Sequence, residues 1–217
     1  FAGKSWLLYA SPLLEPDRGA LSGAVVTLRD AAWLGEQASR LQRMEPAGGL
    51  QALLGESLAM RELRARTERM AAVDAPLLIL GETGTGKELI ARACHELSPR
   101  AQAPFLALNA AALPESLAES ELFGYEAGAF SGAQRGGKPG LLEMAQGGTL
   151  FLDEIGEMSL YLQAKLLRFF NDGSFRRVGG DKERKADVRV VSATHRRLDQ
   201  MVARGEFRED LYYRLNV

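Results

Sequence analysis

The sequence predicts an α/β fold in which helices cover both faces of a parallel sheet. From residue 50 onward, short apolar runs alternate with longer segments of helical periodicity, a pattern typical of such sheets. A glycine-rich segment at residues 81–88 joins the first of these runs to the helical segment after it. At 217 residues, the chain has room for one domain of about 150–200 residues and a smaller piece.

The first 33 residues differ from the rest. Apolar segments at 6–11 and 23–30 flank a stretch rich in turn-forming residues, so an antiparallel hairpin with a long loop is expected. Two strands alone do not enclose a core, and we therefore expect the end of a domain that begins before Phe1. Residues 34–49 are expected to form a linker helix and loop. Leucines seven apart in that linker raise the alternative of a coiled coil, but one heptad is too little to support it.

Between residues 50 and 217 the chain is expected to form one domain. The strands are expected where apolar residues form short uninterrupted runs, and the helices where they recur three or four positions apart. In chain order the predicted elements are helix 57–72, strand 77–80, helix 87–97, strand 105–108, helix 114–122, strand 149–152, helix 159–170, strand 188–192, and short helices at 198–203 and 208–215.

Composition and charge exclude several classes of protein. Lys and Arg number 27 and Asp and Glu 28, so no bulk charge attracts nucleic acid or an anionic membrane. The single cysteine, Cys94, excludes an internal disulfide, and a reducing, cytoplasmic location is expected. The apolar runs are far shorter than the roughly 20 residues that span a bilayer. The chain starts without Met or a signal-peptide pattern, so we expect an internal fragment of a longer protein.

The glycine-rich segment predicts a site for the phosphates of a nucleotide. Glycines let backbone N–H groups turn towards an anion, and the N-terminus of the next helix adds partial positive charge. Lys87 is placed to reach the terminal phosphates. A plain structural turn is the less favoured alternative. The residues assigned to this loop are Gly81, Glu82, Thr83, Gly84, Thr85, Gly86, Lys87 and Glu88, where Glu88 takes the place of the usual Ser or Thr.

Two adjacent acids, Asp153 and Glu154, follow the apolar strand 149–152. Asp153 is expected to hold Mg²⁺, through water, and Glu154 to orient and polarise an attacking water. A solvated acidic turn is the alternative. Because parallel strands bring their carboxyl ends to one edge of a sheet, the phosphate loop makes the catalytic interpretation the stronger one.

Polar residues at three further places would complete an ATP-hydrolysing site. Asn109 ends the strand before the acidic pair and is expected either to hydrogen-bond the second acid of that pair or to cap the next turn. Thr194 and His195 end a later strand, where a polar group can sense the terminal phosphate. Arg208 and Arg214 could stabilise phosphoryl transfer on a neighbouring subunit, although spacing alone favours a surface helix whose acids pair with them.

A segment of glycine and aromatic residues after position 121 is unusual for an enzyme core. An exposed Phe130 is costly unless it contacts a partner, and the alternative is that Phe123, Tyr125 and Phe130 pack into the core. The residues Gly128, Ala129, Phe130, Ser131, Gly132 and Ala133 resemble the GAFTGA signature of bacterial enhancer-binding proteins, the AAA+ activators of sigma-54 RNA polymerase, with Ser in place of Thr. The Glu after the phosphate-loop lysine is similar to that family's own variant, GxTGTGKE.

This resemblance covers about residues 50–217. It implies an AAA+ P-loop NTPase core that stops before its last strand and helical lid, preceded at 1–33 by the C-terminal part of a PAS-like domain. It implies ATP and Mg²⁺ as cofactors and a hexameric ring as the active form. The roles that it implies are: Asp153 and Glu154 as the Walker B pair, Asn109 as the switch partner of Glu154, Thr194 and His195 as sensor I, Arg208 and Arg214 as fingers that reach a neighbour's nucleotide, Leu54 and Gly55 along the adenine, and the Phe130 loop against the sigma factor.

Within the family, the chain looks most like the TyrR/PhhR group of aromatic amino acid regulators, through residues 93–100, 105–111 and 171–179. This implies a transcription activator that is a dimer at rest and binds DNA and an aromatic amino acid effector through domains outside this chain. In the isolated fragment, ATPase activity is expected to be weak or absent. One alternative is a DNA-bound repressor that binds nucleotide but hydrolyses little. Another AAA+ remodeller, such as a helicase loader, is disfavoured by residues 128–133. Arg176, Arg177 and the basic cluster at 182–185 are expected to form a solvated hairpin rather than a DNA-binding surface.

Overall fold

The computed structural model describes residues 6–14, 21–30, 49–131 and 133–216. The chain divides into two units, Phe1–Met44 and Glu45–Val217, and each is described by itself. The first holds the predicted antiparallel hairpin, formed by β1 (Trp6–Leu14) and β2 (Leu21–Asp30). Strand β1 continues three residues past its predicted end, through Pro12, which an edge strand tolerates. Its origin in a PAS-like domain stays a prediction, and residues 34–48 of the expected linker lie outside the described residues.

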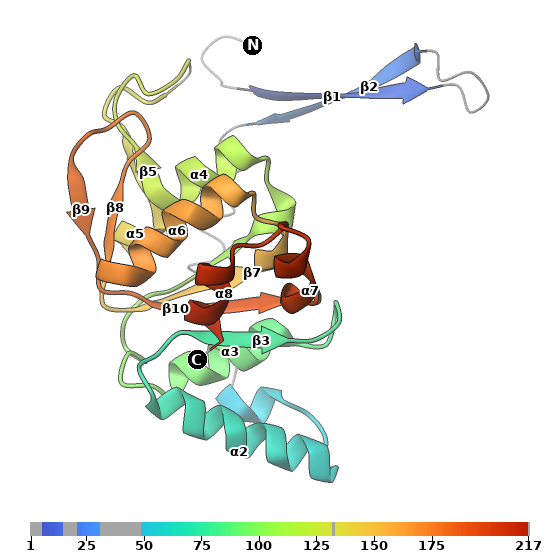
Figure 1. Ribbon diagram of the computed structural model, residues 1–217, viewed down its shortest axis with the longest axis vertical. Coiled ribbons are helices and arrows are strands. Elements are labelled where there is room, and N and C mark those ends of the chain that lie inside the picture. The colour runs from blue at the N-terminus through green and yellow to red at the C-terminus, as the bar shows by residue number, and fades with distance from the viewer. Residues whose placement is uncertain (1–5, 15–20, 31–48, 132, 217) are drawn as a thin grey trace. The chain divides into compact units, whose positions relative to one another are not determined.

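The second unit is built on a parallel sheet with the strand order β3–β10–β7–β4. Its strands are β3 (Leu77–Leu80), β4 (Phe105–Asn109), β7 (Thr149–Asp153) and β10 (Arg189–Thr194). Helices α2 and α3 lie on one face and α4, α6, α7 and α8 on the other, as Figure 1 shows. The α/β fold with a helix-covered parallel sheet is therefore confirmed.

The predicted helices are present and begin and end close to the expected residues, whereas the short helix at 141–144 was not predicted. Ser57 and Ser159 cap two of them by accepting hydrogen bonds from backbone N–H groups three residues on, as N-cap serines do. None of the helices in the described ranges is both long and apolar enough to cross a membrane. The helices are α2 (Leu58–Ala72), α3 (Lys87–Glu96), α4 (Glu115–Phe123), α5 (Leu141–Met144), α6 (Leu160–Asp172), α7 (Leu198–Ala203) and α8 (Glu209–Leu215), with 3-10 turns η1 (Gly49–Ala52), η2 (Ala110–Ala112) and η3 (Ile155–Glu157).

The core lies on both faces of the sheet. On β7, Leu150 and Leu152 pack towards the larger cluster, whereas Phe151 packs with Val191 and Ala91 on the α3 side. All three β7 residues are at most 1% exposed. Because both faces of β7 are buried, its first four residues form a nearly continuous apolar run rather than an alternating one, and this is why the position of the strand can be predicted from the sequence.

Two small antiparallel hairpins lie outside the parallel sheet, and the one formed by β5 and β6 was not predicted. A hairpin around Arg176 and the 182–185 cluster was expected and is present, but the expectation that its basic residues are solvated is wrong for two of them. The Arg177 side chain is 13% exposed and pairs with Glu143 at 2.7 Å, and Arg184 pairs with Glu126 at 3.0 Å. The additional strands are β5 (Gly124–Tyr125) with β6 (Lys138–Pro139), and β8 (Ser174–Arg176) with β9 (Glu183–Lys185).

Candidate functional site

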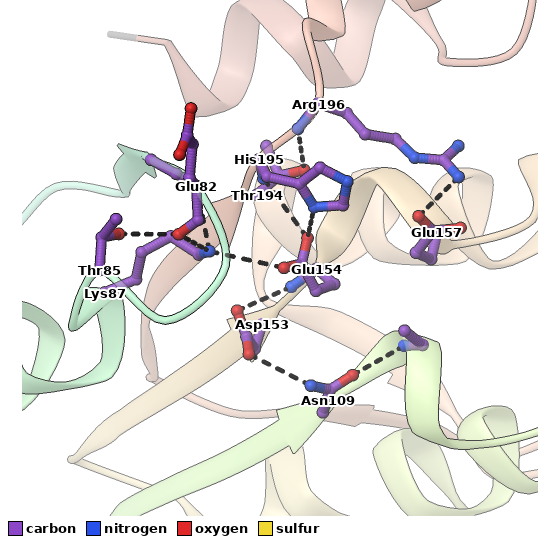
Figure 2. A network of polar contacts seen from close by, with 12 residues as sticks. Glu82, Thr85, Lys87, Asn109, Asp153, Glu154, Glu157, Thr194, His195 and Arg196 are labelled. Carbon is purple, nitrogen blue, oxygen red and sulfur yellow. Dashed lines mark hydrogen bonds and ion pairs between the residues drawn. The ribbon is translucent and has the colours of Figure 1, made fainter.

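The carboxyl ends of the four parallel strands meet at one sheet edge, and the predicted polar residues gather there. Figure 2 shows the loop after β3 facing the ends of β4, β7 and β10. A cavity of about 550 Å³ opens between them. It is lined by Thr83, Gly84, Gly86, Lys87, Glu88, Asn109, Ala111, Asp153, Glu154, Glu157 and His195.

The phosphate loop has the backbone that its glycines predict. Gly84 and Gly86 have φ angles of 81° and 87°, in the left-handed region that glycine enters without strain. The buried Lys87 at the start of α3 points back along the loop (Figure 2), and its Nζ donates to the carbonyl oxygens of Gly81 and Glu82, each at 3.1 Å. It also donates to Glu154 Oε1 at 3.5 Å. A lysine amine has three N–H donors, and these three acceptors engage all of them.

Glu154 leaves the strand in an unusual conformation. It is the one non-glycine residue in the described ranges with a positive φ, 52°, a strain of order 1 kcal/mol. Its Oε2 accepts a hydrogen bond from His195 Nδ1 at 2.7 Å and one from the His195 backbone N–H at 3.4 Å. Burial disfavours its charged form, but the bonds from His195 and the charge of Lys87 outweigh this and lower its pKa. Glu154 is therefore an ionised carboxylate at neutral pH.

Asn109 contacts the other acid, and the prediction that it bonds Glu154 is wrong in this structure. Its Nδ2 donates to Asp153 Oδ2 at 3.2 Å, and its Oδ1 accepts from the Ala111 N–H at 2.9 Å. The pairing of β4 with β7 sets Asn109 opposite Asp153, while the left-handed turn carries Glu154 towards His195. The alternative that Asn109 caps the next turn is confirmed.

The acids at this edge fit a magnesium ion that is bound together with a nucleotide. Burial, and then the neighbouring Glu154, raise the pKa of Asp153, so a nearby cation would stabilise its charged form. The part of the chain that the structure describes has no cluster of three His, Cys, Asp or Glu side chains able to hold a metal by themselves. Mg²⁺ commonly takes one or two carboxylates together with phosphate oxygens and water. Glu88, where Ser or Thr is usual, pairs with Arg92 at 2.8 Å, which offsets its charge beside the loop.

Thr194 supports the site and does not line the cavity. Its side chain is fully buried, its Oγ1 accepts from the Arg196 N–H at 3.0 Å, and its carbonyl oxygen accepts from the Gly81 N–H at 3.2 Å. Glu157, which was not predicted as a site residue, lines the cavity and pairs with Arg196 at 2.6 Å. Its place three residues after the acidic pair was the available signal.

The remaining predicted site residues do not line the cavity of their own chain. Leu54 is 85% exposed, and the backbone of Gly55 has a φ of 119°. Arg208 pairs with Asp210 at 2.7 Å, as the charge pattern of the helix allowed, and the exposed Arg214 donates to a backbone carbonyl of α6. Neither arginine lines the cavity.

The segment after β5 presents an aromatic side chain at the surface. Phe123 and Tyr125 are buried, whereas Phe130 is 43% exposed and meets the Tyr125 ring edge-on at a centroid distance of 5.0 Å. The core alternative is thus confirmed for the first two residues and wrong for Phe130. Of the six signature residues, Gly132 lies outside the described ranges.

This segment rests on the β8–β9 hairpin, beside which it runs in Figure 1. The Glu126 N–H donates to the Val178 carbonyl oxygen at 3.0 Å. A Cβ on Gly179 would lie 2.7 Å from that of Ala129, so only glycine lets the two backbones approach this closely. The hairpin therefore supports the base of the segment that carries Phe130.

Residues 53–217 match the protein family described as the Sigma-54 interaction domain. The chain belongs to this family. It is 49% identical over 219 residues to the HTH-type transcriptional regulatory protein TyrR of Enterobacter agglomerans, a match that covers 99% of this chain and 42% of that protein. It is 57% identical over 165 residues to the Nif-specific regulatory protein of Herbaspirillum seropedicae, covering 76% of this chain and 30% of that protein. The chain thus spans less than half the length of these relatives.

A solved structure shows the same fold. NtrX from Brucella abortus in complex with ADP superposes with a TM-score of 0.70 and 43% identity, over 85% of this chain and 37% of that one. The NtrX complex with ATP gives a TM-score of 0.68. The predicted AAA+ P-loop NTPase core of a sigma-54 activator is therefore confirmed.

Proposed function

We propose that this chain binds ATP with Mg²⁺ and hydrolyses it, and that hydrolysis in a hexameric ring remodels sigma-54 RNA polymerase. The observation that carries the proposal is that Lys87 and Glu154, 67 positions apart in sequence, lie 3.5 Å apart in one cavity. A phosphate-binding lysine beside an ionised carboxylate is the arrangement that phosphoryl transfer to water requires. NtrX, which has the same fold, is described in complex with ADP and with ATP, and this supports nucleotide as the ligand.

Each group has a role set by its position. The backbone N–H groups of the loop and Lys87 hold the phosphates of ATP. Asp153 would hold Mg²⁺, which supplies charge neutralisation on the phosphate oxygens when bound. Glu154 accepts a proton from the attacking water. Because all three donors of Lys87 are engaged, its contact with a phosphate requires it to release one acceptor, and the longest bond is the one to Glu154.

The two arginines of the α8 region are proposed to act on a neighbouring subunit. Arg208 and Arg214 do not line the cavity of their own chain, and an arginine supplied from another subunit stabilises the charge that develops in phosphoryl transfer. ATP turnover per subunit should therefore rise with protein concentration through the range of assembly. Arg214→Ala should abolish this rise while ADP still binds, whereas Arg204→Ala, at an exposed arginine paired with Glu206, should not. A rate per subunit that stays flat as the protein assembles would contradict the role proposed for the two arginines.

The Phe130 segment is proposed to contact the sigma factor. A side chain that is 43% exposed on a glycine-rich segment is suited to contact a partner. Phe130→Ala should abolish activation from a sigma-54 promoter and leave ATP turnover within about twofold, because the residue lies outside the cavity. Gly136→Ala, in the same connection with no atom within 4 Å of the added carbon, is the matched control. Activation that survives deletion of residues 128–133 would refute this assignment.

The finer regulatory role follows from likeness to TyrR and is part of the same proposal. We propose a response to aromatic amino acids, with effector and DNA bound by domains outside this chain, and a dimer at rest. The alternative is a DNA-bound repressor with little ATPase activity. The Phe130→Ala variant separates the two, because it should remove activation and spare repression.

A further inference from the structure

We propose that a second cavity, between α4, α6 and the β8–β9 hairpin, binds a small organic anion, and that the bound anion holds this hairpin against the Phe130 segment. The three elements are neighbours in Figure 1. The cavity has a volume of about 390 Å³, which is within the range of small-molecule sites, and its lining shares no residue with the cavity at the sheet edge. Its lining residues are Glu119, Phe123, Tyr161, Lys165, Arg168, Phe175, Arg176, Arg177, Val178, Gly179 and Gly180.

Cations outnumber acids at this cavity, because four of its lining residues are Lys or Arg and only Glu119 is acidic. Three of the four bases are paired with carboxylates. The fourth, Arg176, is exposed and has no ion pair within the described residues, so its guanidinium is available to an anion. Glu119 already accepts hydrogen bonds from Tyr161 and Lys165. A ligand that carries a negative charge and no cationic group fits this balance best.

Aromatic rings form the apolar part of the cavity. Phe123 and Phe175 are buried, whereas the Tyr161 ring is half-exposed and can stack on a planar apolar group. Lys165 Nζ lies 5.6 Å from the Phe123 ring centroid and 4.9 Å from that of Tyr161. Burial disfavours the charged form of this lysine, but its bonds with Glu119 and Tyr161 outweigh this and raise its pKa. The cavity thus offers cations beside aromatic surface, which suits an organic anion with a planar apolar body.

One wall of the cavity is the turn at residues 177–180, which supports the base of the Phe130 segment. Val178 of this turn lines the cavity. Its N–H donates to the Gly124 carbonyl oxygen at 2.9 Å, and its own carbonyl oxygen accepts from the Glu126 N–H at 3.0 Å. A ligand that binds the turn in this conformation raises the population of that conformation. The bound anion therefore stabilises the arrangement in which the hairpin supports the Phe130 segment.

The experiment measures the binding of anilinonaphthalene sulfonate, an aromatic anion, to the full-length protein by fluorescence, with ADP present to fill the sheet-edge cavity. The neutral N-phenylnaphthylamine, which lacks the sulfonate, is the matched probe. Arg176→Gln should weaken binding of the sulfonate roughly 5- to 10-fold, since an exposed charge contributes less than a buried one, and should leave the neutral probe unaffected. Arg66→Gln makes the same charge change at an exposed position of α2, away from this cavity, and should change neither affinity.

The aromatic wall is tested separately. Tyr161→Ala should weaken both probes, because it removes the ring on which they stack, whereas Tyr161→Phe should stay within about twofold of the wild type. Equal wild-type affinity for the two probes overturns the anion site. An Arg176→Gln variant that binds the sulfonate as tightly as the wild type does so too.

Hydrogen exchange measures the effect on the Phe130 segment. With the sulfonate at about ten times its Kd, the N–H groups of Glu126 and Val178 should exchange at least about threefold more slowly. Binding without slower exchange at these two groups overturns the link to the hairpin. The functional consequence rests on the proposed contact between the Phe130 segment and the sigma factor, whereas binding and exchange do not. A Phe130→Ala variant that still activates would therefore refute that contact and leave the anion site standing.

Discussion

Replacing Arg189 by leucine tests how the end of helix α2 and the start of strand β3 are held against strand β10. Arg189, the first residue of β10, is 4% exposed. Its guanidinium donates to the carbonyl oxygens of Met70 at 2.7 Å, Ala71 at 3.2 Å and Ala75 at 3.2 Å. Two of these carbonyls end α2, and the third lies just before β3. The side chain thus donates to carbonyls at the C-terminal end of α2, where intrahelical N–H donors run out, and it ties the helix to the strand that leads into the phosphate loop.

The magnitude follows from those three bonds. Hydrogen bonds to charged groups are worth about 1.5–3 kcal/mol each, but removing a buried guanidinium also removes its desolvation penalty. That penalty is evident because burial lowers the pKa of Arg189. We expect a net loss of about 3 kcal/mol in the free energy of unfolding. For a domain of this size, this corresponds to a Tm lower by roughly 6–12 °C.

Urea unfolding followed by circular dichroism measures the loss. Arg189→Lys keeps the charge but has one nitrogen in place of a planar fork, so it should recover less than half of the loss. Arg176→Leu, at an exposed arginine of β8, should stay within about 0.5 kcal/mol of the wild type. An Arg189→Leu variant that loses less than about 1 kcal/mol, or a fully stable Arg189→Lys, would refute the three-bond argument.

Two further predictions concern stability. Gly124→Ala should cost more than about 2 kcal/mol in a urea titration, because its φ is 76° and the added carbon would lie 2.5 Å from the Gly140 nitrogen; a neutral result would contradict the close approach. Burial lowers the pKa of His95, so the unfolded state binds more protons below its ordinary pKa of about 6.5 and stability should fall from there as the pH drops. In the wild type the Thr149 hydroxyl lies 2.9 Å from His95 Nδ1. His95→Asn keeps a hydrogen-bond partner for this hydroxyl but removes the titrating imidazole. Unfolding midpoints measured between pH 7 and 5 should therefore fall less steeply with pH in this variant than in the wild type.

The elements that sequence predicted well are those with strong local causes. Strand β3 has the predicted ends, and α2 begins after the Ser57 cap, because burial on both faces and capping leave plain marks in sequence. Strands β5, β6, β8 and β9 have two or three residues each. These strands form where two separate segments pair with each other in the fold. A stretch of two or three residues is too short to show the alternating hydrophobic pattern of a strand.

The sequence by itself determined the phosphate loop, the acidic pair and the shared sheet edge, because each depends on residue type and on the order of apolar runs. Only the tertiary structure decided which partner each polar side chain has. Strand register set Asn109 opposite Asp153, and a left-handed turn sent Glu154 to His195. Packing likewise paired Arg177 with Glu143. A hydrogen bond requires its donor and acceptor to lie about 3 Å apart. Whether two side chains come that close depends on strand register and backbone angles, and the spacing of residues along the sequence does not specify these.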